Sequence, residues 1–91
     1  MGFRYKRGLG VEYDLQGYIY FQTRRYNKLP EWEQENIKKL CCSAACENHA
    51  ALFEFLTTDA NGVYITQKYY IAPATLYRAV RKYYRAYAKM L

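Results

Sequence analysis

The stretch VYITQKYYIAPATLYRAVRKYYRAYAK, residues 63–89, decides the fold that the sequence predicts. After Pro73 its apolar residues recur at steps of three and four, which is the spacing of one buried face of an α-helix. That face is formed by Leu76, Ala79, Val80, Tyr83, Tyr84 and Tyr87. The opposite face carries Arg78, Arg81, Lys82, Arg85 and Lys89.

Residues 63–71 have the β-branched and aromatic composition of a strand. We nevertheless expect a short helix there, because a clear helix begins immediately after Ala72. Ile65 would face inward, Tyr69 would close the short helix, and Ile71 would be buried just past the turn. Residues 63–89 therefore predict a helix-turn-helix unit.

The segment YYIAPATLYR, residues 69–78, resembles a stretch of helix-turn-helix proteins of Firmicutes prophages and mobile elements, including ArpU/RinA-type late transcription regulators. It is also similar to the Thr-Leu-Tyr-Arg stretch of invertase and resolvase DNA-binding domains. The resemblance covers about residues 65–87. Tyr70 stands where many such units have glycine, and Ala72 replaces a capping serine worth about 1 kcal/mol. Pro73, at the first helical position, partly compensates.

The resemblance implies a non-enzymatic transcription regulator that binds double-stranded DNA. Arg78 is the expected base reader, because a guanidinium can bond guanine through two hydrogen bonds. A homodimer is a further expectation, because one recognition helix reads only a few base pairs. A basic arm (Arg4, Lys6, Arg7) is expected to enter the minor groove. The residues expected to contact DNA are Thr75, Tyr77, Arg78, Arg81, Lys82, Arg85 and Lys68.

Charge is segregated along the chain. Residues 1–29 carry six basic and two acidic side chains, residues 30–59 two and six, and residues 60–91 six and none, giving +4, −4 and +6. Segregated positive charge favours a polyanionic partner. Two alternatives stay open. The basic face is ordinary solvated surface, or the chain is a small phage-derived protein-binding inhibitor, anti-CRISPR-like, that uses the helices as a scaffold.

The length predicts a single, mainly α-helical domain over residues 1–91. We expect an irregular basic arm over 1–28 with a possible short strand at 18–23, and a long or bent helix over 30–57, with any bend near 45–48. Trp32 is expected to cap the core at the first turn of that helix, with an exposed docking role as the alternative. Tyr18, Tyr20 and Tyr26 either stack on unpaired bases or pack on the helices, and both possibilities stay open.

Cys42, Cys46 and His49 would share one face of a helix, but zinc normally requires a fourth ligand from another segment. Cys46 and His49 also lack an orienting third group for nucleophilic catalysis. We therefore expect no metal, no cofactor and no enzymatic activity. Apolar runs are too short to span a bilayer, and no apolar stretch follows the charged amino terminus, so the expected location is cytoplasmic, without membrane contact.

Overall fold

The computed structural model describes residues 6–91, and within this range the chain is helical with no strand. Three short 3-10 turns connect or precede longer helices: η1 Arg7–Leu9, η2 Tyr26–Lys28 and η3 Cys46–Asn48. The α-helices are α1 Tyr13–Arg24, α2 Glu31–Ala45, α3 His49–Thr57, α4 Gly62–Tyr69 and α5 Pro73–Met90.

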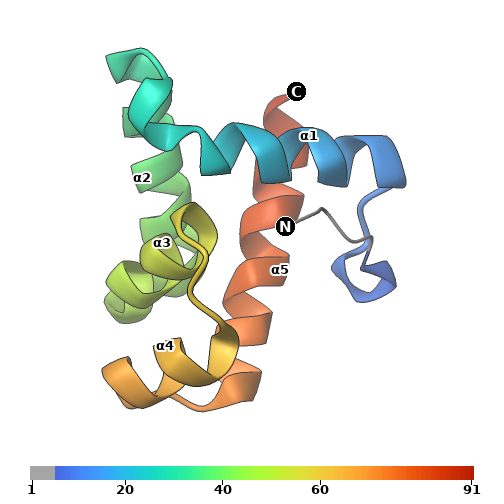
Figure 1. Ribbon diagram of the computed structural model, residues 1–91. Coiled ribbons are helices and arrows are strands. Elements are labelled where there is room, and N and C mark those ends of the chain that lie inside the picture. The colour runs from blue at the N-terminus through green and yellow to red at the C-terminus, as the bar shows by residue number, and fades with distance from the viewer. Residues whose placement is uncertain (1–5) are drawn as a thin grey trace.

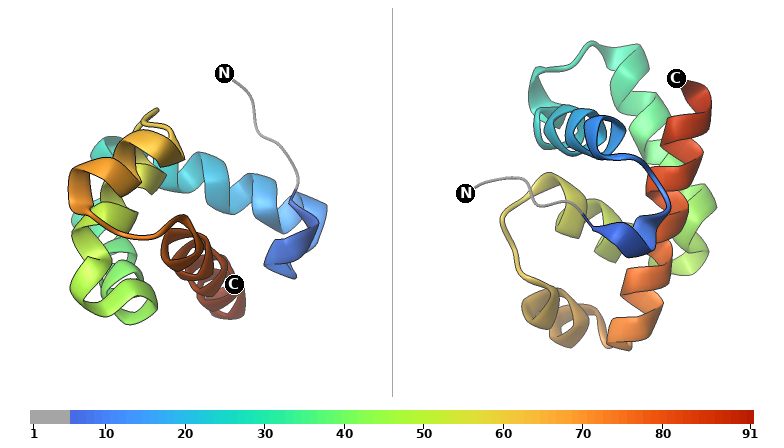
Figure 2. Two further views of the ribbon diagram at one scale, coloured as in Figure 1. Left: turned by 90° about the horizontal axis from the view of Figure 1, so that it is seen from below. Right: turned by 90° about the vertical axis from the view of Figure 1, so that its right-hand side faces the viewer.

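Helix α5 is the central element of the molecule (Figure 1). It packs against α2 and α3 on one side and against η1 on the other, while α1 crosses its carboxy-terminal half and α4 lies across its amino-terminal end (Figures 1 and 2). This arrangement leaves one long side of α5 without a covering helix within residues 6–91. Among residues 6–91, no helix combines the length and the apolar composition that a membrane-spanning segment requires.

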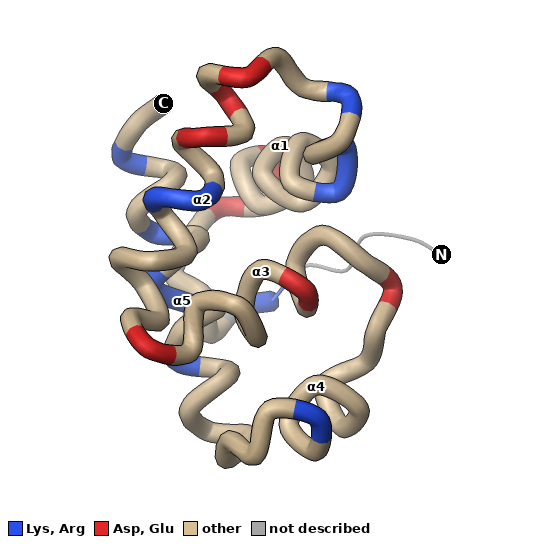
Figure 3. The backbone as a smooth tube through the Cα atoms, turned by 90° about the vertical axis from the view of Figure 1, so that its left-hand side faces the viewer, with Lys and Arg blue, Asp and Glu red and all other residues tan. Residues whose placement is uncertain are grey.

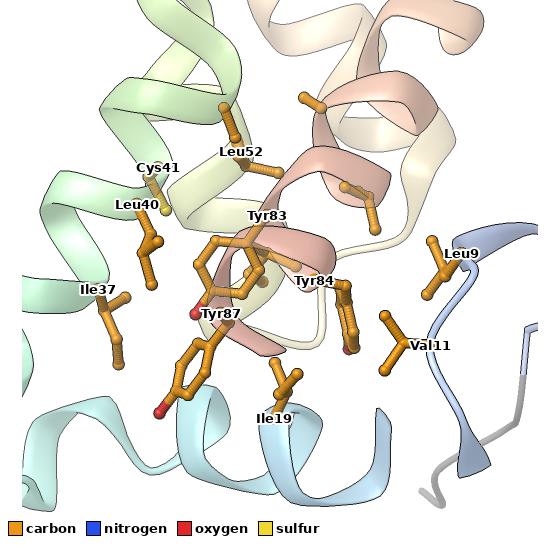
Figure 4. Close-up of a cluster of buried hydrophobic side chains, with 14 of the residues drawn as sticks. Leu9, Val11, Ile19, Ile37, Leu40, Cys41, Leu52, Tyr83, Tyr84 and Tyr87 are labelled. Carbon is orange, nitrogen blue, oxygen red and sulfur yellow. The ribbon is translucent and has the colours of Figure 1, made fainter. Parts of the chain in front are cut away.

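The main core forms around three tyrosines of α5 (Figure 4). Tyr83 is fully buried, and Tyr84 and Tyr87 are almost so. Burial of the rings raises the pKa of all three phenols, and for Tyr84 the value reaches about 12. A buried hydrogen bond in this core joins the hydroxyls of Thr23 and Tyr83, which lie 2.6 Å apart. Around the rings lie Leu9, Val11, Ile19, Ile37, Leu40, Cys41 and Leu52.

A second, smaller cluster joins α3, α4 and α5. Its buried members are Ala51, Ile65 and Leu76, one from each helix. Partly buried Tyr69 and Ile71 pack against it. The cluster therefore fixes the short α4 against the start of α5. The predicted short helix is confirmed over Gly62–Tyr69, as are the buried positions of Ile65 and Leu76.

The prediction of an irregular arm over 1–28 with a strand at 18–23 is wrong for the described residues, because 13–24 form helix α1. Gln16, Ile19 and Thr23 are buried at helical spacing along it. Packing on α5 and α3 therefore overrides the strand propensity of the Tyr-Ile-Tyr-Phe run. Tyr18 and Tyr20 lie on this helix, and Tyr26 packs edge-on against Phe53.

The segment 30–57 is not one helix but two, α2 and α3, broken at η3. The break falls where the bend was expected, and it is sharper than a mild bend. Cys46 has φ 50° and ψ −117°, a backbone conformation that non-glycine residues rarely adopt. Trp32 does not cap the core, since 66% of its surface is exposed. The expectation of a core-capping tryptophan is therefore wrong.

Candidate nucleic-acid interface

The exposed side of α5 carries a stripe of cations. Arg78, Lys82, Arg85 and Lys89 are exposed and follow steps of four, three and four residues, which place them along one face. This face is opposite the stripe that ends in Tyr87. At 1.5 Å per residue the four cations extend over about 16 Å of the helix. Figure 3 shows basic positions along α5 and no acidic one.

No carboxylate neutralises the stripe within residues 6–91. The ion pairs formed there are Arg24–Asp59, Lys38–Glu35 and Lys68–Glu54, and none includes a cation of α5. The acidic residues lie elsewhere, at the starts of α1 and α2 and around η3 and α3 (Figure 3). Uncompensated cations on one face produce a local positive potential that attracts phosphate.

The turn between α4 and α5 exposes the first residues of α5. Tyr70 ends α4 in the left-handed conformation, with φ 56° and ψ 46°. The amide of Ile71 donates to the carbonyl oxygen of Thr66 at 3.1 Å, closing the end of α4. Pro73 takes the first helical position of α5, and Ala72 provides no side-chain cap, as the sequence predicts. The two helices are thus separated by only three residues, 70–72.

Lys68, Arg81 and Arg85 are held by contacts within the protein, and the contact of Arg85 with Leu9 is described below. Lys68 Nζ donates to Glu54 Oε1 at 2.9 Å, so its charge is directed toward α3 and away from the α5 stripe. This hydrogen bond lowers the pKa of the Glu54 carboxyl and raises that of Lys68. The guanidinium of Arg81 lies over the Tyr77 ring at 5.3 Å. Arg81 is half-buried, and its Nε has no hydrogen-bond acceptor within residues 6–91.

Thr75 and Arg78 line a cleft between α5 and the α2–α3 junction. Lys82 and the exposed Cys46 also line this cleft. Thr75 is half-buried there, whereas Arg78 is exposed. The predicted contact residues therefore do not form one continuous surface. Arg78, Lys82 and Arg85 share the open stripe, Thr75 turns toward the cleft, Arg81 is stacked, and Lys68 belongs to another surface.

The amino-terminal segment 6–11 borders the other side of α5. The Tyr77 hydroxyl lies directly against Gly8, where a β-carbon would collide with it. Arg85 Nε donates to the Leu9 carbonyl oxygen at 2.9 Å, and its guanidinium packs over Gly10, whose φ is +70°. The two glycines of the RGLG stretch, Gly8 and Gly10, were the sequence signal for this close contact with α5. The prediction of a minor-groove arm did not take them into account.

The described part of this segment is fixed rather than free. The side chain of Gln16 is buried, accepts from the Lys6 amide at 2.9 Å, and donates to the carbonyl oxygens of Lys6 and Val11. Lys6 is exposed and lines a hollow with Tyr77. Its cation therefore lies beside α5. Arg4, the first cation of the predicted arm, lies outside the described residues.

The three cysteines differ in their exposure. Cys41 is buried, and burial raises the pKa of its thiol to about 12, so it stays protonated at neutral pH. Cys42 and Cys46 are exposed free thiols. Within residues 6–91 no three histidine, cysteine or acidic side chains gather in a way that could hold a metal ion.

No protein-family model, curated protein sequence or solved structure significantly matches this chain.

Proposed function

We propose that this chain is a non-enzymatic double-stranded DNA-binding protein, a small transcription regulator of the prophage or mobile-element type. The observation that carries the proposal is the exposed stripe of Arg78, Lys82, Arg85 and Lys89 on α5, which forms no ion pair within residues 6–91. A helix of this kind fits the major groove of B-DNA, which is about 12 Å wide. Lysine and arginine side chains along it would neutralise phosphates on both walls.

The proposed roles differ along α5. Arg78 lies in its second turn, next to the protruding α4–α5 corner, and we assign it to a base edge in the groove. Lys82, Arg85 and Lys89 lie progressively further from that corner and are assigned to phosphates. Lys6, beside Tyr77, adds a phosphate contact from the amino-terminal segment. Because Lys68 is paired with Glu54, we do not give it a DNA contact.

The spacing of helices supports the assignment. A short helix, a three-residue turn and a longer exposed helix are the elements of a helix-turn-helix unit, whose second helix enters the major groove. The packing of Ile65 on Leu76 and Ala51 holds α4 behind the start of α5. The acidic start of α2 lies near the opposite end of α5, where it would not repel a duplex engaged by the α4–α5 corner (Figure 3).

The experiment is a titration of random-sequence duplex DNA at several salt concentrations. Four or five phosphate contacts predict that log affinity falls with log salt with a slope of about −4. Lys82→Ala should reduce this slope by about one. Lys28→Ala, the same change on exposed η2, is the matched control and should leave it unaltered.

Two results would speak against the proposal. Absence of duplex binding at low salt would reject it and favour the protein-binding inhibitor instead. If Lys82→Ala and Lys28→Ala reduced the salt slope of the affinity equally, net charge rather than the α5 stripe would control binding. Arg78→Ala should also reduce discrimination between a selected site and random DNA, by about 1–3 kcal/mol for the base pair it reads.

A further inference from the structure

Exposed apolar side chains gather at the end of the molecule opposite α4. Trp32 at the start of α2 is 66% exposed, and Met90 at the end of α5 is 55% exposed. Both line a hollow of about 240 Å³ together with Tyr18, Leu40 and Tyr87. This hollow lies between the first turns of α2 and the last turns of α5, with α1 beside it.

The apolar surface continues along the outer side of α1. Tyr18 also lines a second, shallower hollow with Tyr13 and Phe21, both of which are more than half exposed. Because Tyr18 belongs to both hollows, these side chains form one surface, which we call the aromatic patch. It consists of Tyr13, Tyr18, Phe21, Trp32 and Met90.

The size of the aromatic patch is that of a docking surface. Each large side chain contributes roughly 100 Å² when half exposed, so the patch presents on the order of 500 Å². Contiguous apolar surfaces of this size on soluble proteins generally mark interaction sites. With its polar rim, the patch approaches the roughly 800 Å² that each partner provides in a standard protein–protein interface.

The charges on the rim indicate which partner fits. Glu33 lines the hollow on its α2 side, while Arg25, just after α1, lines the second hollow at the other end of the patch. A two-fold axis that passes beside Tyr18, which lines both hollows, can exchange these two ends. It would then bring Glu33 of one copy against Arg25 of the other, twice in each pair. A surface that is complementary to itself in this way suits an isologous dimer.

We propose that the aromatic patch binds a second copy of this chain, with Trp32 of each copy buried over the hollow of the other. This dimer stands independently of DNA binding.

The test uses the protein without DNA. Sedimentation equilibrium should show a reversible shift from the 10.9 kDa chain to twice that mass as concentration rises. Trp32 is the only tryptophan, so its fluorescence should shift to shorter wavelength over the same concentration range. Trp32→Ala should weaken the dimer at least about 30-fold, because buried tryptophans dominate interface energetics. Tyr70→Ala removes a more exposed aromatic at the opposite end and should leave the dimer dissociation constant unchanged.

Charge exchange tests the two-fold arrangement directly. Glu33→Lys and Arg25→Glu should each weaken the dimer, while the double variant should restore it. Circular dichroism melting of every variant separates loss of the dimer from loss of the fold. A chain that stays monomeric at high micromolar concentration overturns the proposal, even if a different protein binds through Trp32. An unchanged dimer in Trp32→Ala overturns it as well, by placing the interface elsewhere.

Discussion

Arg85 Nε and the carbonyl oxygen of Leu9 lie 2.9 Å apart, and this hydrogen bond joins the amino-terminal turn to α5 across 76 positions of sequence. Arg85 therefore has two roles in this account, as a tie within the fold and as a cation on the exposed stripe. Lys82 has no hydrogen-bond or ion-pair partner among the described residues. The two residues can be separated by experiment.

Arg85→Ala should lower the free energy of unfolding by about 1–2 kcal/mol, because it removes a charge-assisted hydrogen bond and exposes the backbone of residues 9–10. Lys82→Ala should change it by less than about 0.5 kcal/mol. Urea unfolding followed by circular dichroism measures both. Equal stability of the two variants would show that the Arg85–Leu9 bond contributes nothing to folding.

Tyr70→Gly should raise the free energy of unfolding by up to about 1 kcal/mol. The left-handed backbone at Tyr70 costs a non-glycine residue about 1–2 kcal/mol, and glycine removes this strain. Glycine also increases the conformational entropy of the unfolded chain, which offsets part of the gain in stability. The ring is 94% exposed, so its removal forfeits little packing. The opposite change, Gly10→Ala at φ +70° beneath the Arg85 guanidinium, should destabilise the chain. Thermal melting of the two variants should therefore move in opposite directions.

Thr23→Val and Tyr83→Phe should each lower stability by about 1–3 kcal/mol, because each leaves the other buried hydroxyl without its partner. The double variant removes both hydroxyls and should cost less than the sum of the single losses. A double-mutant cycle from urea unfolding gives the coupling. Strict additivity would mean that the 2.6 Å contact carries no interaction energy.

Stability should fall steeply above pH 10. Burial raises the pKa of Tyr83 and Tyr84 in the folded chain, to about 12 for Tyr84, whereas tyrosines in the unfolded chain ionise near pH 10. Between these values the unfolded state binds fewer protons, so rising pH favours unfolding by about 1.4 kcal/mol per pH unit for each buried phenol. Below pH 10 neither state ionises, and this effect is absent.

Alkaline titration monitored by circular dichroism and tyrosinate absorbance measures that dependence. Tyr84→Phe should reduce the slope of the free energy of unfolding against pH above pH 10, by the amount that one proton contributes. Ionisation of all twelve tyrosines near pH 10 while the helices stay intact would contradict the burial of these rings.

The sequence predicted the carboxy-terminal half of the fold because its signals are local. The step of three and four residues from Leu76 to Tyr87 identified α5, and Pro73 marked its start. The short α4 was predicted against its own strand propensity, from its position before α5. Its buried Ile65 then packs as a helical residue would.

The amino-terminal half was mispredicted because tertiary contacts decide it. The strand-like Tyr18–Phe21 run becomes helical when Ile19 and Thr23 pack on α5, and no local signal reports that contact. The break at Cys46 has no glycine or proline to mark it. In the candidate site, helical spacing alone predicted that the cations of α5 share one exposed face. The pairing of Lys68 with Glu54 and of Arg85 with Leu9 depends on segments distant in sequence.

The most direct test of the central claim maps amide chemical shifts while duplex DNA is added. The account predicts that the largest changes fall along the outer face of α5, at Arg78, Lys82 and Arg85, and on the adjoining residues 6–10. Amides around Lys68 and in α2 should change little. Shifts confined to the aromatic patch around Trp32, or no shifts with duplex in excess at low salt, would contradict the assignment of α5 as the DNA-contacting helix.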